Sequence, residues 1–227
     1  MKGLNKIFWE VYQPYQKPAV QRCDRLPLSE FPELDRGAME ALRQPLEDGV
    51  ITVSRVTNTV TFPAECILIG AMNPCPCGFK GLPEARCGGA GACERYGARI
   101  SGPLRDRIDL HVEVPRLKPD ELIGAQDGEC SVAIRARVLA ARERQTARLG
   151  PARTNAKMTP RELKASVALD EEAEAFMRLV AARMNLSARV FDRIQKVGRT
   201  IADLAGEPQV RKAHLAEAVQ FRDRSDA

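Results

Sequence analysis

An asparagine follows directly after a continuous apolar run in the stretch AECILIGAMNPCPCG, where Asn73 comes shortly after CILIGA. Such a run is typical of a strand that is buried on both faces of a parallel sheet. In α/β proteins the carboxyl ends of these strands line the ligand crevice, so Asn73 is placed to contact a phosphate or to orient a water. The alternative is an asparagine that begins a turn before Pro74. Position alone leaves both interpretations open.

Four cysteines follow Asn73 in a glycine-rich segment, at positions Cys75, Cys77, Cys87 and Cys93. Four thiolates are sufficient to hold one zinc ion in a tetrahedral site. The Cys-x-Cys spacing differs from the Cys-x2-Cys spacing of ordinary zinc knuckles, so free cysteines in a tight loop are the alternative. A redox pair is less favoured, because that chemistry uses Cys-x-x-Cys at the start of a helix.

Two arginines have the chemistry to bind phosphate oxygens, because a guanidinium group is planar and permanently charged. Arg107 lies in LRDRIDL, between a predicted helical turn and a predicted strand, and a salt bridge with Asp106 or Asp109 is its alternative role. Arg189 borders the apolar stripe of a predicted helix, where most arginines only face solvent.

Composition permits a polyanionic partner without requiring one, since the 227 residues carry a net charge of +5. Five arginines between positions 135 and 148 predict either a nucleic-acid contact or a solvated basic helix, and no aromatic residues interleave with them. Seven cysteines without an export signal predict reduced thiols and a cytoplasmic protein. No apolar run approaches the length of a membrane span, so we expect no membrane partner.

The elements expected to position these residues alternate between strands and helices, which favours an α/β layer. We expect a helix over 33–49 that is kinked or ended by Pro45, and a hairpin over 50–62. CILIGA is the buried strand, and the alternation in DLHVEVP, residues 109–115, predicts a second strand.

From about residue 155 onward every pattern predicts helices. Asp170 and Ser187 are expected to cap two of them. An apolar stripe recurs at alternating spacings of four and three residues, which predicts a strongly amphipathic helix; its members are Val190, Ile194, Val197, Ile201 and Leu204. A weaker stripe in the preceding basic helix has Ile134, Val138, Ala141 and Leu149.

Three long phrases together resemble one family: ELDRGAMEALRQPLEDGVITVSRVTNTVTFPAECILIGAMNPCPCG, RYGARISGPLRDRIDLHVEVP and LSARVFDRIQKVGRTIADLAG. They are similar to the magnesium-chelatase-like AAA+ ATPases of bacteria, the YifB/ComM group, over about residues 30–222. The resemblance implies the C-terminal part of an AAA+ P-loop-type α/β domain over 30–150 and a small helical lid bundle over 155–224, after an atypical segment 1–29. It further implies a hexameric, ATP-driven ring that moves branched DNA during DNA uptake.

The resemblance also assigns roles to single residues. Asn73 matches sensor 1, Arg107 matches the arginine finger that reaches the ATP of the next subunit, and Arg189 matches sensor 2. Glu30 matches the glutamate that ends the strand with an Asp-Glu pair. The hairpin over 50–62 corresponds to one that points at the central pore in related motors. The family's loop often has four cysteines, although Cys93 falls later than the usual fourth position.

Two departures from the family indicate an incomplete ATP site. No stretch of the sequence has the pattern G-x-x-x-x-G-K-[ST], whose amides and lysine hold phosphates. Ser29 replaces the aspartate that holds Mg²⁺, and Pro27 is expected to interrupt that strand. We therefore expect a truncated member that is inactive alone and works with a homo-oligomeric ring or a full-length homologue. The alternatives are a non-enzymatic module that docks on such a ring or on DNA, and a small zinc-stabilised nucleic-acid binder.

Overall fold

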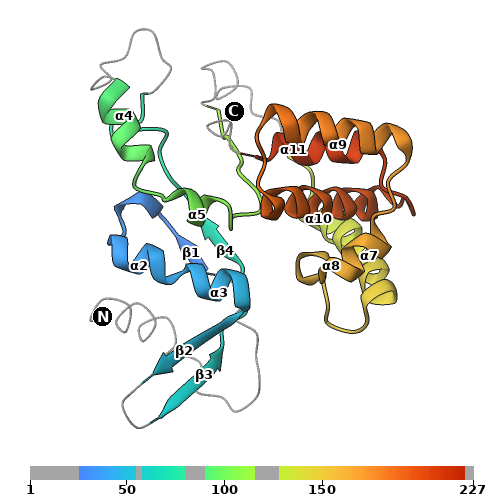
Figure 1. Cartoon of the computed structure of the whole chain (residues 1–227), viewed down its shortest axis with the longest axis horizontal. Helices are drawn as coiled ribbons and strands as arrows, with labels where there is room; N and C mark the ends of the chain where they lie inside the picture. Colours follow the sequence, from blue (N-terminus) through green and yellow to red (C-terminus); the bar gives the residue numbers. More distant parts are fainter. Residues whose placement is uncertain (1–25, 55–57, 80–89, 116–127, 223–227) are drawn as a thin grey trace. The chain divides into compact units, whose positions relative to one another are not determined.

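The computed structural model describes residues 26–54, 58–79, 90–115 and 128–222. Over these residues the chain has a helix-rich α/β fold with one parallel and one antiparallel pair of strands (Figure 1). It divides into two units, residues 1–107 and residues 108–227, and each is described by itself. Of the atypical segment expected over residues 1–29, residues 1–25 lie outside the described residues. None of the helices in the described ranges has the length and apolarity needed to cross a membrane.

The parallel pair joins β1 (Leu26–Leu28) to β4 (Leu68–Gly70). The expectation that Pro27 interrupts this strand is wrong, because Pro27 is the central residue of β1. The two residues that flank Pro27 make the backbone hydrogen bonds to the β4 segment. The Leu26 N–H donates to the Ile67 carbonyl at 2.8 Å, and the Leu28 carbonyl accepts from the Ala71 N–H at 2.9 Å. Backbone groups alternate along a strand, so the missing N–H of proline lies on the side away from β4.

The strand predicted from CILIGA is present in β4, but the prediction that it is buried on both faces is wrong. Ile67 and Ile69 are 55% and 50% exposed. Parallel sheets normally have both faces covered. In the described residues β4 has β1 as its single strand neighbour, which leaves these isoleucines open to solvent.

The predicted hairpin is confirmed by β2 (Val50–Ser54) and β3 (Thr59–Pro63), which pair antiparallel. The helix expected before it is divided into α2 (Arg36–Ala41) and α3 (Arg43–Asp48). Pro45 lies in the first turn of α3, where its missing N–H removes no helical hydrogen bond. Asp35 begins α2 by accepting hydrogen bonds from the backbone of Gly37 and Ala38 at 3.0 and 3.3 Å.

After the cysteine-containing segment the first unit ends with α4 (Ala90–Gly97) and α5 (Gly102–Arg105). The strand predicted over 109–115 is wrong, since this segment has no regular structure. Val112 and Val114 are 66% and 85% exposed. Here His111 donates its backbone N–H to the carbonyl of Phe221, at 2.7 Å, which is a contact with the end of a helix. Alternation of apolar residues predicts a strand only where a neighbouring strand accepts its backbone bonds.

The second unit is helical. Its long elements are α7 (Ser131–Leu149), α8 (Pro160–Ser166), α9 (Glu171–Arg183), α10 (Ala188–Ala205) and α11 (Lys212–Gln220). Both predicted caps are confirmed: Asp170 accepts from the Ala173 N–H at 2.8 Å, and Ser187 accepts from the Val190 N–H at 3.3 Å. Gly206 ends α10 in the left-handed conformation, with φ of 79°.

Helix α10 lies at the centre of this unit, with α9 and α11 on one side and α7 and α8 on the other (Figure 1). Ile194 is fully buried and Val190 is 4% exposed, as their stripe predicts, while Leu204 is 42% exposed. Gly198 allows α11 to approach, since a Cβ there would lie 2.9 Å from Leu215 Cδ2. The stripe predicted for α7 is only partly buried: Ala141 is buried, but Ile134 and Val138 are 41% and 42% exposed.

Candidate functional site

The carboxyl ends of β1 and β4 lie side by side, and this places Glu30 and Asn73 at one edge of the sheet. The strands are parallel and in register, and just beyond them the Phe31 N–H donates to the Ala71 carbonyl at 2.9 Å. Glu30 precedes this bond on one chain segment, and Asn73 follows it on the other. Both residues are exposed. The structure therefore brings together two of the residues singled out from the sequence.

The backbone turns sharply at Glu30, whose φ and ψ of 53° and 43° are left-handed. A non-glycine residue in this region costs roughly 1 kcal/mol or more and needs support from its surroundings. The support comes from the short 3-10 helix η2 (Phe31–Glu33), whose Phe31 is 3% exposed. Gly70 leaves room for the ring, because a Cβ there would lie 3.4 Å from Phe31 Cγ.

Tyr96 of α4 lies next to this edge, and sequence reasoning missed it. The side chain is 6% exposed. Burial raises the pKa of the Tyr96 hydroxyl, and the carboxylate of Glu33 adds to the increase; a hydrogen bond from the backbone of Asn73 acts in the opposite direction, and Glu30 also raises the pKa. A neutral phenol thus lies close to both Asn73 and Glu30. Its only sequence signal is an aromatic residue on a helix of small and charged residues.

Arg99 connects the chain after α4 to η2. Its Nη1 donates to the Pro32 carbonyl at 3.2 Å and to the Glu33 carboxylate at 2.5 Å. The guanidinium carbon lies 6.0 Å from the centre of the Tyr96 ring, within the range of a cation–π contact. These contacts join the segment after α4 to η2 at the β1–β4 edge and place the guanidinium group of Arg99 over the Tyr96 ring.

Arg107 is held in the first unit by an ion pair with Glu47 of α3, and it donates to the Pro103 carbonyl at 2.6 Å. Its side chain is only 9% exposed. The sequence alternatives named Asp106 and Asp109 but not Glu47, which is distant in the chain and gave no signal. Asp109 forms an ion pair with Arg193 within the second unit.

Arg189 lies in the first turn of α10 and is exposed. It belongs to the second unit, so its position is described relative to α10 alone. Of the four residues assigned to a nucleotide site, the structure brings Glu30 and Asn73 together and places Arg107 against α3.

Two of the four predicted zinc ligands are close neighbours. The Sγ atoms of Cys75 and Cys77 are 3.2 Å apart, in a turn closed by the Gly78 N–H donating to the Cys75 carbonyl at 3.0 Å. This separation is longer than a disulfide bond and shorter than the roughly 3.8 Å between two thiolates on tetrahedral zinc. Cys75 and Cys93 are buried, and Cys87 lies outside the described residues.

The described residues contain no group of three or more His, Cys, Asp or Glu side chains arranged to hold a metal ion. Cys75 and Cys77 lie close together but nearer than two zinc-bound thiolates would, and the full set of four stays a prediction. Elemental analysis of protein purified without chelators tests it, with about one zinc per chain expected.

Two family models match most of the chain. A model described as "Magnesium chelatase, subunit ChlI" matches residues 22–122, and one described as "Magnesium chelatase, subunit ChlI C-terminal" matches residues 128–222. The first covers the β1–β4 edge with Glu30 and Asn73, and the second covers α7 to α11.

Several bacterial proteins are similar over nearly the whole chain. "Competence protein ComM" of Haemophilus influenzae is 41% identical over 196 residues, which cover 86% of this chain and 38% of that protein. "Uncharacterized protein YifB" of Escherichia coli is 38% identical over 197 residues, covering 86% of this chain and 38% of its own length. An uncharacterized protein of Mycobacterium tuberculosis is 38% identical over 208 residues, which cover 90% of this chain and 41% of that protein. The chain therefore spans about two fifths of the length of these relatives.

Proposed function

Because this chain belongs to the magnesium-chelatase-like family, in the group of the ComM and YifB proteins, we propose that it forms part of an ATP-driven ring motor that acts on branched DNA. The observation that carries the proposal is the shared edge of β1 and β4, where Glu30 and Asn73 meet. Ligands of open α/β sheets bind beyond the carboxyl ends of the strands, which is where these two side chains lie.

At this edge each side chain has a role that fits its chemistry. Glu30 is the general base that takes a proton from the attacking water. Asn73 both donates and accepts hydrogen bonds, so its amide holds the water and an oxygen of the γ-phosphate in line. Tyr96 positions Asn73 through the bond to its backbone. This pre-organisation by a buried neighbour is what a hydrolytic site requires.

The two arginines act on charge that develops during phosphoryl transfer. Arg107 serves the nucleotide of the neighbouring subunit, and it must exchange its Glu47 partner for phosphate oxygens to do so. Arg189, in the first turn of α10, takes the role of sensor 2 and binds phosphate oxygens of a nucleotide. In this assignment the first unit supplies the general base, Glu30, and the second unit supplies an arginine that binds the nucleotide, Arg189.

The phosphate-holding part of the site comes from elsewhere. No stretch of the 227 residues has the pattern G-x-x-x-x-G-K-[ST], so the phosphate-binding amides and lysine belong to chain beyond these residues or to another polypeptide. The residues present also do not fit a complete Mg²⁺ site. Ser29 offers a neutral hydroxyl beside Glu30, and the described residues hold no cluster of three metal ligands.

Among the described residues one edge of β4 has no strand partner, and this edge indicates where the missing part adds. Ile67 and Ala71 make backbone bonds to β1, so the alternating groups of Leu68 and Gly70 lie on the opposite side of the strand. On the outer side of β1, Pro27 has no N–H to offer another strand. An added strand is therefore expected to pair with β4, where it would also cover Ile69.

A chimera tests the proposal. Residues 22–222 would replace the matching segment of the full-length Haemophilus influenzae relative, and ATP hydrolysis would be measured per assembled ring. The chimera is expected to hydrolyse ATP, and Asn73→Ala is expected to slow hydrolysis about a hundredfold or more, the scale of removing one positioned hydrogen-bonding group. Gln220→Ala, which removes an exposed side-chain amide from α11, is the matched control and is expected to leave basal hydrolysis unchanged. An equally active Asn73→Ala ring would refute the assignment.

A further inference from the structure

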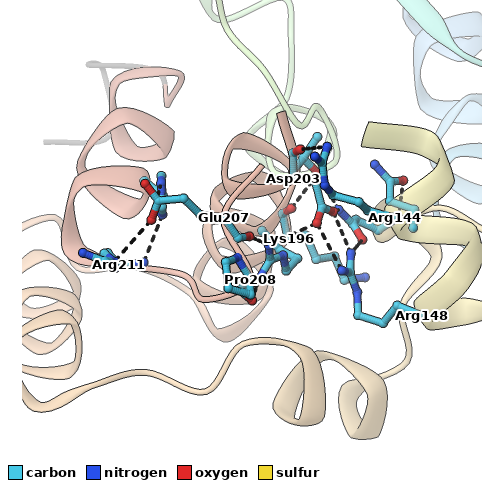
Figure 2. Close-up of polar contacts among 12 residues, drawn as sticks. Arg144, Arg148, Lys196, Asp203, Glu207, Pro208 and Arg211 are labelled. Carbon is cyan, nitrogen blue, oxygen red and sulfur yellow. Dashed lines mark hydrogen bonds and ion pairs between the residues drawn. The ribbon is translucent and has the colours of Figure 1, made fainter. Parts of the chain in front are cut away.

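Three arginines contact Asp203, a buried residue of α10, two of them through its carboxylate and one through its backbone carbonyl (Figure 2). Arg148 donates to the two oxygens of Asp203 at 3.1 and 2.6 Å, and Arg199 donates to Oδ1 at 3.0 Å. Arg144 donates to the backbone carbonyl of Asp203 at 2.9 Å. Asp203 and Arg199 are each 1% exposed. Arg144 and Arg148 belong to the five arginines of the predicted basic helix, whereas Arg199 and Asp203 were not singled out from the sequence.

The hydrogen-bonding capacity of Asp203 is fully used. The Asn155 amide donates to its Oδ2 at 2.8 Å, in addition to the three bonds from Arg148 and Arg199. Arg199 also donates to the carbonyls of Pro208 and Glu207, at 2.7 and 2.6 Å. Asp203 therefore satisfies the buried charges closest to it and has no bond left for a further cation.

Positive charge remains in excess around this carboxylate. The three guanidinium groups carry three charges, against one on Asp203 and about half a charge from the C-terminal end of α10. Glu207 does not make up the difference, because its carboxylate lies 3.2 Å from Nε of Arg211 and points away from Arg144 and Arg148 (Figure 2). The balance is an excess of about 1.5 positive charges. Burial lowers the pKa of Arg199, Asp203 opposes this, and the neighbouring charge of Arg148 adds to the decrease.

A cavity of about 450 Å³ opens among these arginines, between α7 and the chain that follows α10. Arg144 and Arg148 extend into this region from consecutive turns of α7 (Figure 2). A Cβ at Gly206 would lie 3.2 Å from Nη2 of Arg144, so glycine at this position lets the guanidinium group lie close to the backbone. Arg144 is exposed and uses one N–H for Asp203, so the rest of its guanidinium group faces the opening.

We propose that this cavity, the Arg144 pocket, binds a phosphate group. Guanidinium groups bind phosphate oxygens through paired hydrogen bonds, and the volume is in the range of small-ligand sites. The pocket is distinct from the site described above, because Arg199 lies ten residues, or about 15 Å of helix, beyond Arg189. Phosphate binding in this pocket is independent of the proposed function.

The first test uses inorganic phosphate as the probe and thermal unfolding of the whole chain as the readout. Phosphate is expected to raise the melting temperature more than sodium chloride at equal ionic strength. Arg144→Gln removes one pocket charge and its bond to the Asp203 carbonyl, and leaves the bonds of Arg148 and Arg199 to the Asp203 carboxylate in place. This variant is expected to need at least several-fold more phosphate for the same shift.

Arg142→Gln is the matched control, because it removes the same charge from the same helix on a different face. It is expected to respond to phosphate as the unchanged chain does. Equal weakening in both variants would mean that phosphate only screens a basic helix, and would overturn the proposal. So would the absence of any phosphate-specific stabilisation.

A second pair of titrations identifies the source of the phosphate. ATP and a single-stranded DNA oligonucleotide would be titrated separately against the chain and both variants. If DNA is the source, Arg144→Gln weakens DNA binding and reduces its salt dependence by about one charge, while Arg142→Gln does not. If a nucleotide is the source, the Arg144-dependent loss appears with ATP alone. Binding of both ligands that is indifferent to Arg144 would refute the pocket.

Discussion

The core of the helical unit and the β1–β4 edge differ most in how completely they cover their own apolar residues. In the helical unit Met177, Ile194 and Leu215 are between 0% and 1% exposed. At the sheet edge Ile67, Ile69 and Met72 are between 45% and 55% exposed. Both regions have apolar sequences, so composition does not separate them.

The two regions differ because their packing partners come from different places. Helix α10 is covered on several sides by helices of its own unit, which supply the core around Ile194. Strand β4 has one strand partner in the described residues and has a free edge. We therefore expect the helical unit to be stable by itself and the candidate site to be completed by additional chain. The predictions below test each side of this difference.

The largest expected effect is on catalysis at the incomplete site. In the chimeric ring, Arg107→Ala is expected to lower ATP hydrolysis by roughly a thousandfold, the scale of an arginine that neutralises charge on the transferred phosphoryl group. The loss of its Glu47 ion pair should cost more than an exposed pair does, on the order of 1–3 kcal/mol, because the Arg107 side chain is 9% exposed and that of Glu47 is 34% exposed. Hydrolysis and the melting temperature would be measured on the same ring.

Arg43→Ala is the control for Arg107, because Arg43 also pairs with a nearby carboxylate, that of Glu40 at 2.7 Å. It is expected to leave hydrolysis unchanged. Normal hydrolysis by the Arg107→Ala ring, with a slightly reduced melting temperature, would reduce Arg107 to a structural ion pair and remove it from the site.

The next effect concerns the helical unit. Asp203→Asn leaves Arg148 and Arg199 with no compensating charge, and breaking such a buried pair costs about 3 kcal/mol or more. Denaturant unfolding would measure the loss in the free energy of unfolding. Glu174→Gln is the control, since its pair with Arg178 is exposed and is worth well under about 1 kcal/mol. Similar losses from both variants would contradict the buried network.

A smaller pair of substitutions compares the two regions directly. Ile194→Ala creates a cavity in a closed core and is expected to cost about 2 kcal/mol or more. Ile69→Ala, at a side chain that is 50% exposed, is expected to cost less than about 1 kcal/mol. Hydrogen exchange of the peptides that contain each position would report the two local losses separately. Comparable losses would mean that β4 is covered after all.

The smallest effect is a pH dependence in the Thr159 capping box of α8. Hydrogen bonds from Arg153, then from the Thr159 backbone and hydroxyl, lower the pKa of Glu162 from 4.5 to about 2. A lowered folded-state pKa means that the stabilisation is present above pH 4.5 and is lost as the pH falls toward 2. Glu162→Gln should remove this part of the acid dependence of unfolding, and an identical profile would contradict it.

Local patterns in the sequence predicted much of the helical unit. Ser187 and Asp170 cap their helices as expected, because a capping side chain acts within a few residues of itself. The buried Arg199–Asp203 pair was missed, although its spacing of four residues on the buried face was visible. Burial of a charge depends on partners such as Arg148, which lies on another helix and which no local pattern identifies.

The sheet edge was harder to predict, because strands depend on distant neighbours. Val112 and Val114 alternate as a strand would, but no strand in the described part of the chain pairs with their segment, and both side chains are exposed. Pro27 was expected to interrupt a strand, and it is tolerated because its ring lies on the free side of β1. The position of Asn73 after an apolar strand was predictable, whereas its contact with Tyr96 was not.

The central claim is that these residues form one part of a nucleotide site whose phosphate-binding part lies elsewhere. Calorimetric titration with ATP tests it most directly, on the 227-residue chain carrying Arg144→Gln and on the chimeric ring. The account predicts no binding at micromolar ATP for the chain, because the phosphate-binding amides and lysine are absent from its sequence, and micromolar binding for the ring. Micromolar affinity in the pure chain alone would contradict the account.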